Sequence, residues 1–209
     1  MPTQVNLPTG KDIKNGVRLF EKHLPREAMY KTATFLVKHH WGNSKETADG
    51  LGVLLLTWNQ AFYRYGQFSF EKLERCIKRK HLTLSSYRVR DISSYSKEDS
   101  GAIKKLFGEL LASLSIESGK KLGVSSPVAA AKALHLLAPE FFPLWDDKIA
   151  RGYKLHYGKK PAEQYIRFIE VTKQIAGNLP SSLNPSLKGR SAIKLVDEYN
   201  FARYTRKWL

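Results

Sequence analysis

Apolar residues recur at helical spacing along almost the whole chain. In residues 11–23 and 25–40 they return every three or four positions, as on one face of an α-helix. Residues 48–66 carry apolar side chains around nearly the whole helical circumference, which predicts a helix buried in the core. No segment gives a clear strand pattern. The chain is therefore predicted to be all-α.

Short polar residues and prolines mark where further helices begin. Pro25 can occupy a first helical turn, where its missing N–H costs nothing. Side-chain oxygens of serine or threonine can cap the following helices, and the candidate caps are Ser44 or Thr47, Ser69, Ser96 or Ser100, and Ser126. The later helices are predicted within residues 126–138, 141–158, 162–177 and 191–209.

We expect these helices to form two lobes with a cleft between them. A chain of 209 residues allows one compact domain or two closely packed lobes. Residues 46–139 would form the central lobe, and residues 1–45 together with 140–209 the second. Because 42% of the residues are hydrophobic and 26% are charged, the chain can bury a sizeable core.

The charge is strongly positive and spread along the chain. Lys and Arg number 35 against 19 Asp and Glu, a formal net charge of +16, which favours a polyanionic partner such as nucleic acid. Residues 72–90 hold seven cations and one acid, interrupted by apolar residues at spacings that suit a folded element. This segment predicts a basic face, with Arg79, Lys80 and Arg88 as candidate phosphate contacts.

Other function classes lack the residues they need. Cys76 is the only cysteine, so an internal disulfide framework and a cysteine-built zinc site are excluded. The histidines do not have the spacing of a metal site, and no phosphate-binding Walker loop or dinucleotide motif occurs. We expect no metal, no cofactor, no membrane segment and no signal peptide. The expected protein is an intracellular monomer of the cytoplasm or nucleoid.

The sharpest local constellation surrounds the turn in residues 119–127, GKKLGVSSP, between two predicted helices. Backbone N–H groups in such a turn and at the next helix N-terminus can bind a phosphate oxygen. The proposed cradle comprises Gly123, Val124, Ser125 and Ser126, with Lys120 and Lys121 adding charge. The alternative is an ordinary helical hairpin with a capping serine and two solvated lysines.

This segment resembles the helix-hairpin-helix superfamily of DNA glycosylases, similar in fold to endonuclease III. The family hairpin, Leu-Pro-Gly-Val-Gly-x-Lys-Thr-Ala, is followed about 19 residues after its lysine by Val-Asp-Thr-His-Val-x-Arg. Here LGVSSPVAA and WDDKIAR stand at the two motifs. Gly123 and Val124 match the hairpin, and Asp146 matches the catalytic aspartate. Ser125 replaces the second glycine, Pro127 stands at the lysine position, and Arg151 matches the final arginine.

The resemblance implies a two-lobed helical fold and base-excision repair of duplex DNA with a damaged or mispaired base. Asp146 would be the catalytic carboxylate. Because Pro127 cannot form a Schiff base, the resemblance implies a monofunctional glycosylase without lyase activity. Asn59 and Gln60 match polar family residues that approach the opened DNA. The aromatic residues Phe141, Phe142, Trp145, Trp58, Phe62 and Tyr63 would supply pocket walls.

Several alternatives stay open at this point. Asp146 or its neighbour Asp147 can act as a helix cap, alone or in addition to a catalytic role. Lys132, on the alanine-rich helix, is a candidate amine nucleophile or electrostatic helper, with an exposed surface lysine as the simpler interpretation. The main rival function is a noncatalytic, nucleic-acid-binding helical protein, and a third is an RNA-directed or mobile-element-associated factor.

Overall fold

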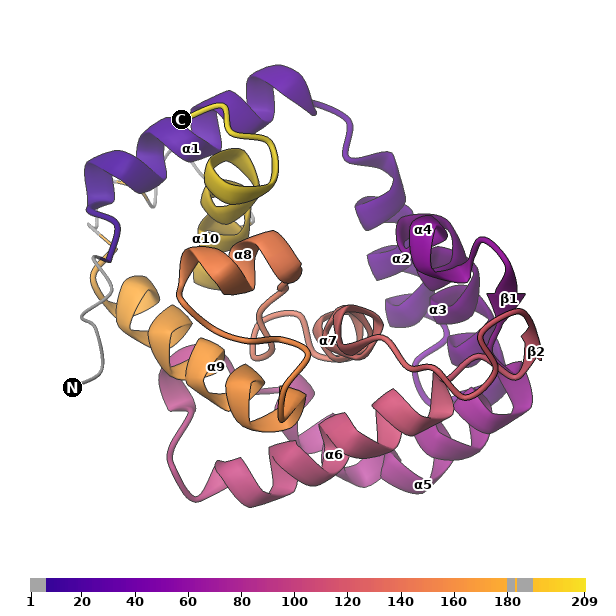
Figure 1. Cartoon of the computed structure of the whole chain (residues 1–209). Coiled ribbons are helices and arrows are strands. Elements are labelled where there is room, and N and C mark those ends of the chain that lie inside the picture. The colour runs from indigo at the N-terminus through magenta and orange to yellow at the C-terminus, as the bar shows by residue number, and fades with distance from the viewer. Residues whose placement is uncertain (1–6, 180–182, 184–189) are drawn as a thin grey trace.

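The computed structural model describes residues 7–179, 183 and 190–209 (Figure 1). Helices dominate these residues, which confirms the predicted all-α class. Two short strands, β1 (Gly66–Gln67) and β2 (Ser118–Gly119), pair antiparallel. The helices are α1 (Gly10–His23), α2 (Ala28–His39), α3 (Ser44–Trp58), α4 (Gln60–Tyr63), α5 (Phe70–Arg88), the 3-10 helix η1 (Ile92–Ser94), α6 (Asp99–Ser113), α7 (Pro127–Leu137), α8 (Asp147–Gly152), α9 (Pro161–Gly177), α10 (Ala192–Asn200) and the π-helix η3 (Phe201–Thr205).

Local capping fixes the start of α5 and of α7. The Ser69 hydroxyl accepts a hydrogen bond from the N–H of Lys72 at 3.1 Å and caps α5. The Ser126 hydroxyl accepts one from the N–H of Ala129 at 3.2 Å and caps α7. Both predicted caps are confirmed, because a capping bond depends only on residues three positions apart.

Other helix ends differ from the prediction. The α2 helix begins at Ala28 rather than Pro25, after Glu27 adopts a left-handed backbone conformation with φ of 43°. The buried helix α3 stops at Trp58, and α4 follows as a separate short helix. Asn43 caps α3, and α6 begins without a capping side chain. These findings replace the predicted caps Ser44, Thr47, Ser96 and Ser100.

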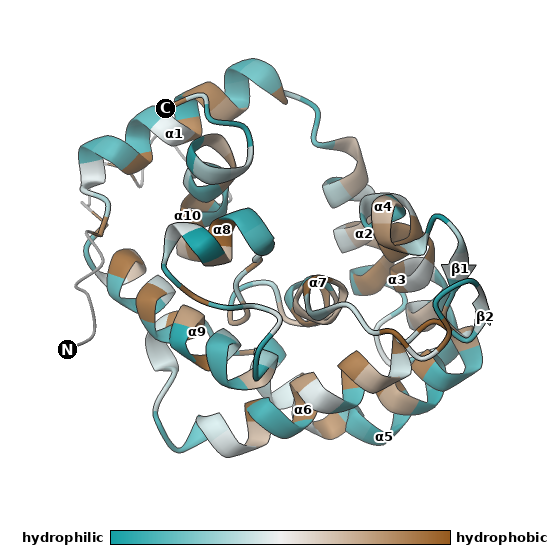
Figure 2. Ribbon diagram, viewed as in Figure 1, coloured by the Kyte–Doolittle hydropathy of each residue, from teal (hydrophilic) through white to brown (hydrophobic). Residues whose placement is uncertain are grey.

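The α7 helix lies at the centre of the molecule, where Figure 1 shows it end-on. It packs against α2, α3, α6 and α9. Four of its residues are fully buried alanines, Ala129–Ala131 and Ala133, and their small side chains let the surrounding helices approach closely. The outer helices α1, α5 and α9 carry both hydrophilic and hydrophobic residues (Figure 2), as expected for helices with one face on the core.

One buried apolar cluster contains residues from both of the predicted lobes. The α2 helix, assigned to the second lobe, packs on α3 and α7 of the first. In the second lobe α10 packs against α1 and α9, and α8 contacts η3. The division into residues 46–139 and residues 1–45 plus 140–209 stays a prediction. Among the described helices, none has the length and apolar character that a bilayer crossing requires.

Candidate functional site

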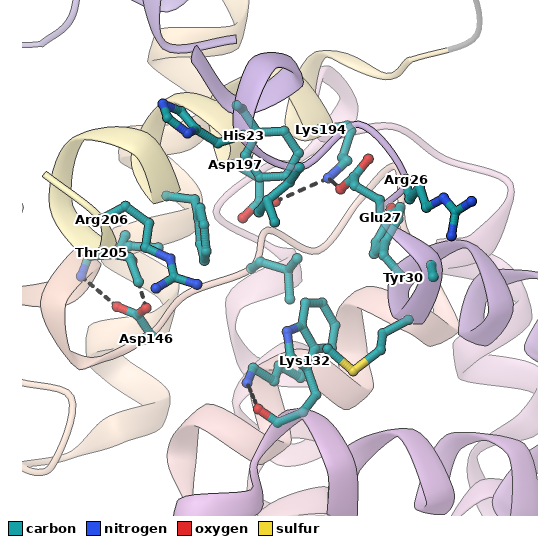
Figure 3. A pocket seen from close by; sticks show the side chains of 18 of the residues that line it. His23, Arg26, Glu27, Tyr30, Lys132, Asp146, Lys194, Asp197, Thr205 and Arg206 are labelled. Carbon is teal, nitrogen blue, oxygen red and sulfur yellow. Dashed lines mark hydrogen bonds and ion pairs between the residues drawn. The ribbon is translucent and has the colours of Figure 1, made fainter. Parts of the chain in front are cut away.

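A cavity of about 720 Å³ opens where α1, α2, α3, α7, α8, α10 and η3 approach one another (Figure 3). Its volume is in the range of sites that enclose small organic ligands. The residues that matter for its chemistry are Tyr30, Trp58, Lys132, Trp145, Asp146 and Asp197. They come from five separate parts of the chain, so the cavity exists only in the folded protein.

Asp146 lines this cavity and also caps α8. Its Oδ1 accepts a hydrogen bond from the N–H of Ile149 at 2.8 Å, and its Oδ2 accepts one from the Thr205 hydroxyl at 2.8 Å. The side chain is half-buried. Both carboxylate oxygens are thus held in place while the group borders the cavity. Asp146 can therefore act as a helix cap and as a functional carboxylate at the same time, because it caps α8 while it borders the cavity.

Thr205, which donates to Asp146, is the last residue of the π-helix η3. After α10 the chain continues as the π-helix η3, and a π-helix places side chains differently from an α-helix. The Thr205 carbonyl also accepts a hydrogen bond from Lys148 Nζ at 3.3 Å, which ties η3 to α8. The sequence predicted a helix within residues 191–209, and no local signal indicated the role of Thr205.

Asp147 has a different environment. Its carboxylate forms an ion pair with Arg151 one turn along α8, and it does not line the cavity. Exposed pairs of this kind contribute little to stability. The structure therefore separates the two neighbouring carboxylates, with Asp146 on the cavity and Asp147 paired with the residue at the family's arginine position.

Lys132 is not the exposed surface lysine of the simpler interpretation. It is only partly exposed and lines the same cavity as Asp146. Its Nζ donates hydrogen bonds to the Trp58 carbonyl at 3.0 Å and to Asn59 Oδ1 at 3.3 Å, and it lies 4.8 Å from the Trp58 ring centroid. Burial lowers the pKa of Lys132 to about 8, although the charge of Asp146 opposes the shift.

The lowered pKa of Lys132 gives a direct test. Reductive methylation of the lysines with ¹³C-formaldehyde should give a dimethyl-lysine resonance that titrates near pH 8, because burial disfavours the ammonium form. The Lys132→Met variant should lack that resonance and keep the others. The N-terminal α-amino group also titrates in this range. If Lys132→Met removes no resonance that titrates between about pH 7 and 9, the buried position of this amine is contradicted.

A cluster of buried charges supports the wall formed by α2 and α10. The Lys194 ammonium contacts Glu27, lies 3.5 Å from Asp197 Oδ2 and lies 3.7 Å from Glu198 Oε1. Arg190 also pairs with Glu198 at 2.9 Å. Although burial favours the neutral amine, the carboxylates raise the pKa of Lys194. Burial raises the pKa of Asp197 to about 6 and that of Glu198 to about 7, against the pull of Lys194.

The predicted phosphate cradle is largely occupied by its own hydrogen bonds. The N–H of Gly123 donates to the Ile116 carbonyl at 2.8 Å, and that of Val124 donates to the Lys121 carbonyl at 3.2 Å. The Ser126 hydroxyl caps α7 and accepts a bond from Asn59 Nδ2 at 3.1 Å. The prediction that Gly123 and Val124 offer free donors is therefore wrong, because residues 114–126 fold on themselves.

The turn also lies apart from the cavity. None of Lys120, Lys121, Gly123, Val124, Ser125 and Ser126 lines it. Lys120 and Lys121 are exposed on the side of β2, and the Lys120 Nζ lies 5.5 Å from the Tyr65 ring centroid. The expected pairing of the glycine turn with Asp146 at one site is not found. A phosphate contact by the two lysines stays a prediction.

Most of the basic segment, residues 72–88, lies on α5, and the segment contributes no residue to the cavity. Arg79 and Lys80 lie 4.0 and 2.7 Å from the Glu109 carboxylate. Arg88 donates to the Leu137 carbonyl at 2.6 Å and stacks 4.2 Å over Trp41, so its role is structural. This basic face and Asp146 therefore do not border the same cavity.

The remaining predicted residues divide between packing and the cavity. Asn59 joins the end of α3 to Ser126 and Lys132, and Gln60 is exposed on α4. Of the expected aromatic walls, Trp58 and Trp145 line the cavity, while Phe141, Phe142 and Tyr63 belong to the core. His23, Arg26 and Arg206 also line the cavity and are all exposed, and none of them was among the site residues predicted from the sequence.

Comparison with known protein families, curated proteins and solved structures finds no match. The resemblance to the helix-hairpin-helix glycosylases accordingly stays a prediction based on the motif residues. Within residues 7–179, 183 and 190–209, no three histidine, cysteine or acidic residues are grouped as a metal site would require.

Proposed function

We propose that the protein is a monofunctional DNA glycosylase that removes a damaged or mispaired base, with Asp146 as the catalytic carboxylate. The observation that carries the proposal is Asp146 itself, fixed through both oxygens and facing a cavity with two tryptophans in its walls. A base swung out of a duplex needs a pocket of this kind, because the reacting bond is inaccessible inside the stack.

The chemistry requires stabilisation of a positive charge. When the N-glycosidic bond breaks, its electrons leave with the base and the sugar C1′ becomes cationic. An ionised Asp146 close to C1′ lowers the energy of that cation and can orient or deprotonate the water that attacks it. The bonds from Ile149 N–H and Thr205 hold the carboxylate, so no reorganisation is needed when the charge develops.

Lys132 has a complementary role in this proposal. Its amine borders the cavity that also contains Asp146, and the two groups interact electrostatically. With a pKa of about 8, most of the amine is protonated at pH 7. An ammonium group beside the departing base stabilises the negative charge that the base acquires, and can supply it with a proton. Lys132 is therefore assigned as the electrostatic helper.

The mouth of the cavity suits a phosphate backbone. His23 is the last residue of α1, Arg26 lies on the connection between α1 and α2, and Arg206 follows η3 across the opening. Arg26 lies just before Glu27, the N-cap residue of α2, and no side chain caps this helix. Cations and free N–H groups in such positions attract phosphate oxygens, and their contribution decreases as salt increases.

A substrate screen tests the proposal. The protein is incubated with duplexes that carry uracil, oxidised guanine, alkylated adenine or a mismatch, and abasic products are then cleaved with alkali. We expect cleavage of at least one duplex only after alkali treatment. Strand breaks before alkali would contradict the monofunctional assignment. Salt-sensitive binding without product from any duplex would favour the noncatalytic nucleic-acid-binding alternative.

A further inference from the structure

The side-chain hydrogen-bond donors on the cavity wall formed by α2 and α10, Lys194 and Tyr30, face partners within the protein. The Lys194 ammonium has three N–H groups and three carboxylate neighbours, Glu27, Asp197 and Glu198. Its side chain is only 8% exposed and lies 4.3 Å from the Tyr30 ring centroid. The charge of Lys194 therefore faces carboxylates of the protein itself.

The Tyr30 hydroxyl is hydrogen-bonded to a buried histidine, His135. His135 Nδ1 lies 2.7 Å from the Phe142 carbonyl oxygen, which can only accept, so Nδ1 carries the proton. Burial and the charge of Lys194 lower the pKa of His135 to about 4, so the ring is neutral and Nε2 is an acceptor. The Tyr30 hydroxyl, 3.0 Å from Nε2, must then donate its single proton to His135.

The same wall retains free acceptors. The Asp197 side chain is 12% exposed and lines the cavity, and only its Oδ2 faces Lys194. Figure 3 shows the carboxylate with its other oxygen turned away from Lys194, toward the side where Thr205 and Asp146 lie. Glu27 also lines the cavity and contacts Lys194 through Oε1. A polar group of a ligand on this wall meets oxygens that accept hydrogen bonds.

We infer that the cavity selects a nucleobase that presents an exocyclic amino group to Asp197, such as an adenine-type base, over a base that presents a carbonyl there. This inference rests on the proposed function and names its substrate class. An amino group donates to the carboxylate, whereas a carbonyl oxygen in the same place meets a negatively charged acceptor and leaves it unpaired. Sites built around a hydrogen bond reject analogues that lack the matching group.

Free bases test the inference without requiring catalysis. Binding of adenine, purine and hypoxanthine is measured at pH 7.5 by ¹H–¹⁵N chemical-shift titration. Purine lacks the amino group, and hypoxanthine has a carbonyl in its place. We expect adenine to bind at least about 10-fold more tightly than either, the usual effect of one hydrogen bond to a charged group. Equal affinities, or no adenine binding up to 10 mM (about the weakest affinity such a titration resolves), would overturn it.

The Asp197→Asn variant assigns the preference to this residue. An amide can donate as well as accept, so the adenine-to-hypoxanthine ratio should fall to within about threefold of unity. The matched control, Asp147→Asn, changes a carboxylate outside the cavity and should keep the wild-type ratio. Asp197→Ser provides a second variant at the same position if Asp197→Asn fails to fold, because it also removes the carboxylate. A wild-type ratio in Asp197→Asn, or in Asp197→Ser where it replaces that variant, would overturn the inference.

The outcomes separate this inference from the proposed function. Excision of uracil from duplex DNA, with no adenine preference among free bases, would uphold the glycosylase and overturn the amino-group selection. Adenine preference that depends on Asp197, with no excision of any duplex base, would uphold the selection and overturn the glycosylase.

Discussion

The Asp146→Asn variant is expected to lose about 10²–10⁴-fold in the rate of base excision, the range found when one positioned catalytic group is removed. Asparagine has nearly the same shape, so it can still accept from Ile149 N–H and cap α8, but it carries no charge to stabilise the sugar cation. Single-turnover excision of the duplex identified by the substrate screen measures the effect. Affinity for that duplex should change little, because the cations at the mouth are untouched.

Asp147→Asn is the matched control for this prediction. It makes the same chemical change one residue away, on a carboxylate that pairs with Arg151 outside the cavity. Its excision rate should stay within about threefold of the wild type, since an exposed pair contributes little. Equal losses of excision rate in the two variants would show that any negative charge near the start of α8 supports the reaction, and that Asp146 has no specific role. An active Asp146→Asn variant would exclude Asp146 as the catalytic carboxylate.

The Lys194→Met variant is expected to lose about 3–5 kcal/mol in the free energy of unfolding, as when one partner of a buried ion pair is removed. Methionine fills most of the space but leaves Glu27, Asp197 and Glu198 without the ammonium between them. Denaturation in urea measures the change. Lys31→Met, which replaces an exposed lysine of α2, is the control and should lie within about 0.5 kcal/mol of the wild type.

The loss in Lys194→Met should depend on pH in a defined direction. The folded protein raises the pKa of Asp197 from 3.8 to about 6 and that of Glu198 from 4.5 to about 7. Between about pH 4 and 7, where the unfolded carboxyl groups are losing protons that the folded ones still hold, the folded state binds more protons than the unfolded state. The contribution of Asp197 and Glu198 to the free energy of unfolding therefore falls as pH rises through this range. Without Lys194 both values rise further, so the deficit should be larger at pH 8 than at pH 5. A pH-independent deficit would indicate lost packing alone.

The site depends on the C-terminal segment as much as on the predicted motif. Thr205 and Arg206 follow α10 and reach the cavity from the opposite side to α2, while Asp197 and Lys194 form its wall. The predicted catalytic carboxylate is therefore positioned by residues that lie about 50–60 positions further along the chain. Changes in α10 or η3 are expected to affect the cavity even where they leave α7 and α8 intact.

The features that the sequence determined are local ones. Periodicity indicated the helical class, and the caps at Ser69, Ser126 and Asp146 were found because each bond joins residues three positions apart. The same motif reasoning selected Asp146, which lines the cavity. Spacing alone could identify these residues, since helix geometry fixes their relative positions whatever surrounds them.

Tertiary packing decided which other groups share the cavity with Asp146. The α7 helix turns Lys132 inward, and the π-helix brings Thr205 onto the carboxylate. The basic face of α5 lies outside the cavity. The N–H groups of Gly123 and Val124 donate to nearby backbone carbonyls rather than to a ligand. These outcomes depend on how helices distant in sequence pack together, and on burial, which sets the pKa of Lys132 and Asp197. No local pattern of residues contains that information.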